Sequence, residues 1–250
     1  MRFSAPLLGG LVVVVIALSM ANKGSADEPD TQAAGPQSSE TDAETPMGRT
    51  GGSVAALGIR GDGVTLTFDD GPHPTHTPQV LDLLAERRTR AIFCLVGGQV
   101  RQHPELVQRI VADGHVLCNH TESHDPNLAA RPPDEISQEI ATTSEAISEA
   151  APGAEARYFR QPARHVTPEV APIAEEHGLA ILDWTVDSQD WKKPGAAAIT
   201  DVIAEALHPG AVILLHDGGG DRSQTVDALP DILDAIQNAG YRVAITPPLP

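Results

Sequence analysis

The chain has 250 residues, of which 41% are hydrophobic and only 3% aromatic, and it carries a formal net charge of -17 at pH 7. This composition is that of a globular protein whose core consists mainly of Val, Ile, Leu and Ala. The negative charge argues against nucleic acid and anionic membrane surfaces as partners, because basic patches supply the affinity for both.

The N-terminal region predicts export from the cell. Arg2 precedes an apolar run, residues 5–21, which is shorter than the roughly 20 residues that a membrane-spanning helix prefers. Small residues at cleavage-site spacing follow, so we interpret residues 1–26 as a secretory signal peptide, with an uncleaved membrane anchor as the alternative. We therefore expect a secreted or extracellular protein, possible association with the cell wall, and no stable membrane partner after signal cleavage.

Two further segments follow the signal. Residues 27–60 are rich in Gly, Ser, Pro and acidic residues and poor in large apolar ones, which predicts a disordered linker. Residues 61–250 are then expected to form one folded domain. No oligomerisation motif is visible, so we expect a monomer.

Within this domain, predicted strands alternate with predicted helices. The strands are expected at 64–68, 91–96, 115–120, 156–160, 179–186, 211–216 and 241–245, and the helices at 77–88, 104–114, 134–150, 168–178, 196–207 and 226–240. This alternation, with nearly continuous apolar strands, predicts a parallel sheet covered by helices. About seven such units favour a barrel, in which a site lies where the strands end.

Polar residues follow several of these predicted strands. They are Asp69 and Asp70, His120 and His124, Arg160, Asp187 and Asp190, and His216. In a barrel all of them face the same mouth. Two adjacent like charges are unfavourable unless a cation lies near them, and a carboxylate with two imidazoles is a typical divalent-metal ligand set. The second carboxylate would then be free to act as a base.

The motifs that contain these residues resemble those of a known family. Thr67-Phe-Asp-Asp-Gly-Pro72, His120-Thr-x-x-His124, Arg160-x-Pro162, Asp187-x-x-Asp190-Trp191 and Leu214-x-His216 are similar, in order, to the five motifs of the polysaccharide deacetylases. This is the NodB-homology domain, carbohydrate esterase family 4. The resemblance extends over residues 62–246.

The resemblance implies a fold, an activity and a set of roles. The fold would be a distorted (β/α) barrel of about seven strands, and residues 61–250 would be the catalytic domain. The activity would be hydrolysis of acetyl groups on an acetylated polysaccharide or oligosaccharide. Asp70, His120 and His124 would bind the divalent metal ion, usually zinc and sometimes cobalt or another divalent ion. Asp69 would be the general base, His216 the general acid, Arg160 and Asp190 their respective partners, and Trp191 and Leu214 the lining of the acetyl pocket.

The chain departs from the family pattern after the third motif. Ala163 and Arg164 stand where many members have an aromatic residue and then glycine. Ala163 can still offer its backbone N–H to an oxyanion. Arg164 could narrow the cleft, bind an acidic group on the substrate, or point into solvent, and the sequence leaves these three open.

The sequence also leaves open the state of two cysteines and the substrate. Cys94 and Cys118 could form a disulfide in an oxidising compartment, or both could be buried thiols. We expect an N-deacetylase acting on N-acetylglucosamine units of peptidoglycan or chitin-type oligomers, with an acetylxylan esterase as the nearest rival. A catalytically weak glycan-binding wall protein and a non-haem iron oxygenase are the alternatives from other classes.

Overall fold

The computed structural model describes residues 63–245, and the predicted signal peptide and linker lie outside these residues. Its strands are β1 (Gly63–Gly71), β2 (Ile92–Leu95), β3 (Val116–Asn119), β4 (Tyr158–Phe159), β5 (Ala180–Ile181), β6 (Val186–Asp187), β7 (Val212–His216) and β8 (Arg242–Val243). Its α-helices are α1 (His76–Glu86), α2 (Gly97–Gln102), α3 (Pro104–Ala112), α4 (Pro133–Ala150), α5 (Ala171–Glu176), α6 (Ala196–Ala206) and α7 (Ser223–Asn238), and its 3-10 helices are η2 (Leu128–Ala130) and η3 (Asp190–Lys192).

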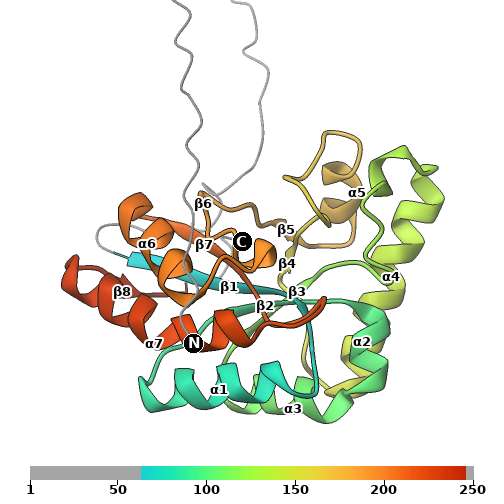
Figure 1. Cartoon of the computed structure of the whole chain (residues 1–250). Coiled ribbons are helices and arrows are strands. Elements are labelled where there is room, and N and C mark those ends of the chain that lie inside the picture. The colour runs from blue at the N-terminus through green and yellow to red at the C-terminus, as the bar shows by residue number, and fades with distance from the viewer. Residues whose placement is uncertain (1–62, 246–250) are drawn as a thin grey trace, which may run out of the picture. The chain divides into compact units, whose positions relative to one another are not determined.

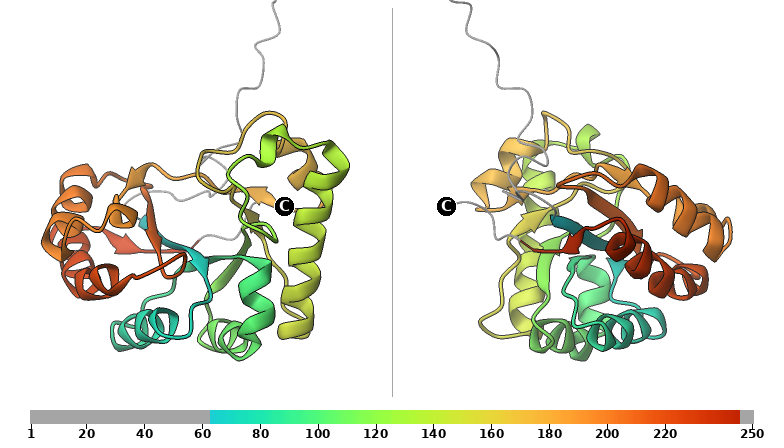
Figure 2. Two further views of the ribbon diagram at one scale, coloured as in Figure 1. Left: turned by 45° about the vertical axis from the view of Figure 1, so that its right-hand side comes forward. Right: turned by 90° about the vertical axis from the view of Figure 1, so that its left-hand side faces the viewer.

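The strands form one parallel sheet in the order β5-β4-β3-β2-β1-β7-β6, and β8 pairs with the start of β1. The sheet is curled, and helices surround its outer side (Figure 1, Figure 2). The predicted fold class, a distorted (β/α) barrel of about seven strands, is confirmed in this open, curled form. Within residues 63–245, no helix is long and apolar enough to cross a membrane.

Side chains alternate along β1 between two environments. Val64, Leu66 and Phe68 belong to the large apolar cluster that also contains Leu81 of α1 and Leu229 of α7, so this face packs against the helices. The intervening residues face the inside of the curl, as successive strand residues point to opposite sides. The inside is therefore where polar groups at the strand ends gather.

The main correction concerns residues 179–186, which the sequence predicted as one strand. They form two short strands at opposite edges of the sheet. Residues of β5 pair with β4, while Val186 pairs with Ile213 of β7. Between them Thr185 already donates its backbone N–H to the Val212 carbonyl at 3.0 Å. The apolar run thus crosses the open side of the curl instead of continuing along one edge.

Two smaller differences bear on the site. β1 continues past residue 68 to Gly71, so both aspartates lie on the strand itself. The helix α2 was not predicted, because the two glycines at its start, Gly97 and Gly98, are typical of a turn. Gly97 allows a close approach there, since a side chain at this position would overlap the carboxylate of Glu122.

Cys94 and Cys118 are adjacent in the parallel register of β2 and β3, with α-carbons 4.2 Å apart, and the structure joins them by a disulfide. Both are fully buried in an apolar cluster with Tyr158 and Leu182. Cys94 is also the register partner of Asp69. The disulfide therefore lies inside the curl, directly beside the strand that carries the aspartates.

We expect the disulfide to contribute to stability. It closes a loop with a sequence separation of 24 residues, and a loop of this size corresponds to about 3.5 kcal/mol of reduced chain entropy in the unfolded state. The double variant Cys94→Ala/Cys118→Ala should therefore unfold at lower denaturant concentration. Reductant should destabilise the unmodified chain but leave the double variant unchanged; an equal effect on both would show that no disulfide forms.

Candidate active site

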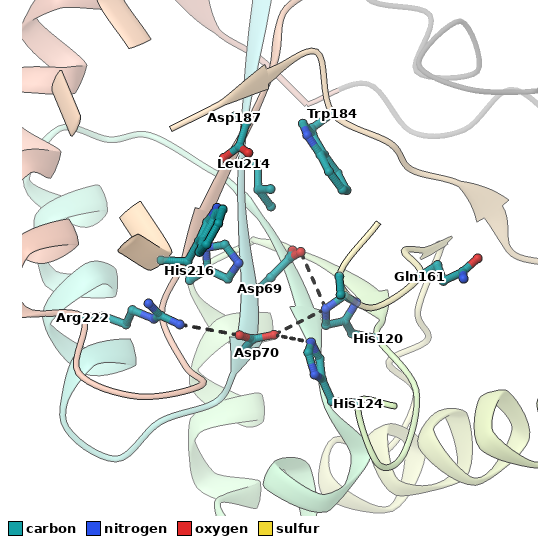
Figure 3. A pocket seen from close by; sticks show the side chains of 12 residues that line it. Asp69, Asp70, His120, His124, Gln161, Trp184, Asp187, Leu214, His216 and Arg222 are labelled. Atoms are coloured by element: carbon teal, nitrogen blue, oxygen red, sulfur yellow. Dashed lines mark ion pairs between the residues drawn. The ribbon is translucent and has the colours of Figure 1, made fainter. Parts of the chain in front are cut away.

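A cavity of about 390 Å³ opens at the carboxyl ends of the central strands (Figure 3). It is lined by Asp69, Asp70, His120, His124, Gln161, Ala163, Trp184, Asp187, Trp191, Leu214, His216 and Arg222. The polar residues predicted at the strand ends thus meet in one place. Arg160 and Asp190 lie behind the lining, each in contact with a residue that faces the cavity.

A β-bulge lets two adjacent carboxylates reach the same cavity. On a regular strand, neighbouring side chains point to opposite faces. The pairing of β1 with β2 shifts between Asp69 and Gly71, and Asp70 adopts a positive φ of 72°. This conformation is uncommon for a residue other than glycine, and a bulge re-aims the side chain that it carries. Asp70 therefore turns from the helix-covered face into the cavity beside Asp69.

Asp70 faces the imidazoles of His120 and His124. Its Oδ1 lies 3.4 Å from Nε2 of His120 and 3.0 Å from Nε2 of His124 (Figure 3). Oδ1 is buried, yet neither contact has the geometry of a hydrogen bond. Burial alone would raise the pKa of Asp70, but the two adjacent imidazoles outweigh it and hold that pKa well below its usual value. The carboxylate is therefore ionised and directed at two nitrogen atoms.

The other ring nitrogen of His120 fixes its orientation. Its Nδ1 lies 2.8 Å from the backbone carbonyl of Arg160, which can only accept, so Nδ1 carries a proton and Nε2 is the nitrogen that faces Asp70. One atom from each of Asp70, His120 and His124 lies within 4.8 Å of the others. A carboxylate oxygen and two imidazole nitrogens, with an unpartnered buried oxygen between the rings, match the ligand set of a divalent metal ion.

Asp69 has a different environment from its neighbour. It is 3% exposed, and its Oδ1 accepts a hydrogen bond of 2.7 Å from Nη1 of Arg160. The Arg160 side chain is fully buried inside the curl, where it also donates to the Thr67 hydroxyl at 2.8 Å and to the Leu182 carbonyl at 3.0 Å. The guanidinium thus holds one oxygen of Asp69 and leaves the other toward the cavity.

His216, on β7, lies on the side of the two aspartates opposite to His120 and His124 (Figure 3). Its Nδ1 is 2.7 Å from Oδ1 of Asp190, and the second oxygen of Asp190 accepts from the His216 backbone N–H and from the Thr225 hydroxyl. Burial alone would lower the pKa of His216, but Asp190, Asp69 and Asp70 outweigh it, so the pKa lies above its usual value. The geometry suits a histidine that holds a proton at Nε2, facing the cavity.

The remaining predicted residues also line the cavity. Trp191 is 49% exposed at the mouth, whereas Leu214 is buried at 5%. Ala163 lines the cavity with a positive φ of 62°. Asp187 accepts the backbone N–H of Gln189 at 2.8 Å and so orders the loop that carries Asp190. Arg164 is exposed and is not among the lining residues.

Sequence reasoning missed three lining residues: Gln161, Trp184 and Arg222. Trp184 stood inside the run interpreted as one strand, and the crossing of that run is what brings it to the cavity. Arg222 follows the glycine-rich segment after the last motif and belongs to none of the five motifs. Both lay outside the strand ends, which were the positions that the fold prediction singled out.

Comparisons with known proteins agree with this geometry. Residues 59–182 match the profile of the family described as polysaccharide deacetylase. A chitooligosaccharide deacetylase of Bradyrhizobium sp. is 42% identical over 197 residues, which cover 74% of this chain and 90% of the relative. A peptidoglycan-N-acetylglucosamine deacetylase of Bacillus cereus is 37% identical over 182 residues, covering 72% of this chain and 84% of the relative.

A solved structure is similar as well. The crystal structure of a peptidoglycan N-acetylglucosamine deacetylase superimposes with a TM-score of 0.70 at 37% identity, covering 73% of this chain and 85% of that one. The sequence match, the curled parallel sheet and the convergence of the motif residues in one cavity lead to one conclusion. The chain belongs to the polysaccharide deacetylase family, the deacetylases of carbohydrate esterase family 4.

Proposed function

We propose that the protein is a metal-dependent hydrolase that removes N-acetyl groups from N-acetylglucosamine units of a polysaccharide or oligosaccharide outside the cell. One observation carries the proposal. Asp69 and Asp70 are adjacent in sequence, but one is held by a buried arginine and the other faces two imidazoles. This difference in environment suits Asp69 to proton transfer and Asp70 to binding a cation.

Asp70, His120 and His124 would hold the divalent ion. The buried Oδ1 of Asp70, which has no hydrogen-bond partner, and the Nε2 atoms of His120 and His124 that face it support this assignment. Zinc suits a carboxylate and two imidazoles, and cobalt accepts the same ligands. When bound, such an ion polarises a carbonyl group and lowers the pKa of a water molecule towards about 7.

Asp69 would act as the general base. The Arg160 guanidinium fixes its orientation, and the second oxygen, 3.7 Å from Nε2 of His120, is directed at the cavity. A carboxylate so placed can accept the proton of an attacking water while the acetyl carbonyl carbon is attacked. Arg160 acts through Asp69 and does not itself face the cavity.

His216 would act as the general acid. Cleavage of the amide C–N bond leaves an amine that needs a proton, and the Nε2–H of His216 is placed to supply it. Oδ1 of Asp190 accepts a hydrogen bond from the other ring nitrogen, Nδ1, at 2.7 Å and stabilises the charged imidazolium. The side chains of Trp191 and Leu214 would enclose the acetyl methyl group, and the backbone N–H of Ala163 would face the developing oxyanion.

The substrate class follows from two relatives that share the same domain. One is named for chitooligosaccharides and the other for peptidoglycan N-acetylglucosamine. Both of these glycans contain N-acetylglucosamine, so amide hydrolysis on that sugar is favoured over O-deacetylation of xylan. An apolar run near the N-terminus, with the features of a signal peptide, supports secretion. We expect the enzyme to act as a monomer.

The base and the metal site can be separated by mutation. Asp69→Asn removes the proton acceptor but no ligand, so it should lower kcat at least about 100-fold while one zinc ion per chain is retained. His120→Ala removes a ligand and should lower both zinc content and activity. The measurements are acetate release and zinc content of the purified variants. A fully active Asp69→Asn would show that the assigned base is wrong.

The pH dependence should report on Asp190. The raised pKa of His216 keeps the imidazole protonated above its usual range, so activity is lost only as the pH rises through that raised value. Asp190→Asn removes the negative charge that most raises the pKa of His216. The alkaline limb of the pH profile of kcat should therefore shift to lower pH by on the order of one unit. Glu169→Gln, an exposed carboxylate on a surface segment, is the control and should leave the profile unchanged. An alkaline limb that does not move in Asp190→Asn would exclude His216 as its source.

The substrate should be identified by acetate release from chitooligosaccharides, peptidoglycan and acetylated xylan, each with and without a chelator. We expect chelator-sensitive release from an N-acetylglucosamine polymer. Release from acetylated xylan alone would assign O-deacetylation instead. No release from any polymer, with zinc bound, would favour a glycan-binding role and make Arg164 the first residue to replace.

A further inference from the structure

The last motif is followed by three consecutive glycines, Gly218 to Gly220, which none of the proposed catalytic roles uses. This loop packs against the bulge that carries the aspartates. The backbone N–H groups of Asp217 and Gly218 both donate to the Asp69 carbonyl, at 3.1 and 3.2 Å. The loop is therefore bonded to the backbone of the residue that precedes Asp70.

Two of these glycines cannot carry a side chain without displacing Asp70. A Cβ atom at Gly218 would overlap the Asp70 carbonyl oxygen, and one at Gly219 would overlap the Asp70 carboxylate at Oδ2. Gly219 also has a positive φ of 68°. The glycine backbone thus fills the space immediately behind the Asp70 side chain, on the side away from the two histidines.

Arg222 holds the loop in this position. The residue is 6% exposed, and its Nε donates to the Gly218 carbonyl at 2.6 Å while Nη2 donates to the Gly219 carbonyl at 3.3 Å. The same Nη2 lies 3.8 Å from Oδ2 of Asp70 (Figure 3). One buried guanidinium therefore contacts both glycine carbonyls and approaches the oxygen of Asp70 that does not face the histidines.

We infer that the loop of Gly218 and Gly219, tied by Arg222, is the positioning element of Asp70. It confines Oδ2 between glycine backbone and guanidinium, so that Oδ1 is presented to His120 and His124. Asp70 needs such support because its positive φ is unfavourable for a non-glycine residue and persists only where neighbours determine it. This role rests on the proposed metal site, and Arg222 acts on the ion only through Asp70.

The sharpest test is Gly219→Ala, which adds one methyl group behind Oδ2 and changes no charge. Partners that orient a metal ligand typically contribute 10–100-fold in metal affinity, so zinc should bind at least about tenfold more weakly. The affinity is measured by competition with a chromophoric chelator. The visible spectrum of the cobalt-loaded chain should also change, because the carboxylate is displaced.

The matched control is Gly178→Ala. Gly178 has a similar positive φ of 75°, but an added Cβ there would meet nothing within 4 Å, so backbone strain is reproduced far from any contact with Asp70. Zinc affinity and cobalt spectrum should match those of the unmodified chain. Thermal unfolding of both alanine variants shows whether either has lost its fold.

Arg222 is tested separately by Arg222→Lys and Arg222→Gln. Lysine keeps the charge but cannot bond both glycine carbonyls in the same way, so both variants should bind zinc at least about tenfold more weakly. Arg164→Gln, at an exposed arginine outside the cavity lining, is the control for lost charge and should bind zinc normally.

The outcomes separate this inference from the proposed metal site. Zinc affinity within twofold of the unmodified chain in folded Gly219→Ala and Arg222→Lys would overturn the positioning role. Normal zinc affinity with a raised KM would overturn it too, and would place Arg222 against the substrate. Tighter zinc binding by Arg222→Gln would show that charge repulsion outweighs positioning. Absence of zinc binding to the unmodified chain would reject the metal site itself, and this role with it.

Discussion

The site depends on one charged side chain buried inside the curled sheet. Arg160 is fully buried, and such a charge is tolerated only when it is paired and hydrogen-bonded. Its donors reach Asp69 and Thr67 on β1 and the carbonyl of Leu182 on the segment that crosses the open side of the curl. The backbone carbonyl of the same residue orients His120. The guanidinium thus joins three parts of the fold and orders one oxygen of the proposed base.

The difference between Asp69 and Asp70 arises from the backbone as much as from their partners. Asp69 lies on the regular part of β1, in register with Cys94 and His216, so its position is determined by two neighbouring strands. Asp70 lies at the bulge with a positive φ and depends on the glycine loop behind it. The bulge brings the two carboxylates into one cavity but gives each its own partners, which is the condition for separate chemical roles.

The sequence predicted the sheet class and most of the residues that line the cavity, because both follow from local patterns. Apolar runs between glycine and proline signals mark the strands, and polar residues at their ends must meet in a parallel sheet. The crossing at 182–185 has no such signal, since it contains neither glycine nor proline. The bulge at Asp70 and the support from Arg222 were also missed. The bulge depends on the pairing of β1 with β2, and the support joins residues about 150 positions apart in the chain.

The sheet fixes the residues proposed for the reaction, whereas loops carry the residues that would select the glycan. Asp69 and His216 lie on central strands, and His120 and Arg160 directly follow β3 and β4, so the sheet fixes the geometry between them. The residues that would contact a sugar beyond the acetyl group lie on loops at the cavity mouth. Trp184, on the segment between β5 and β6, belongs to these loops. Loops can change without disturbing the sheet, so one catalytic frame can serve different polymers.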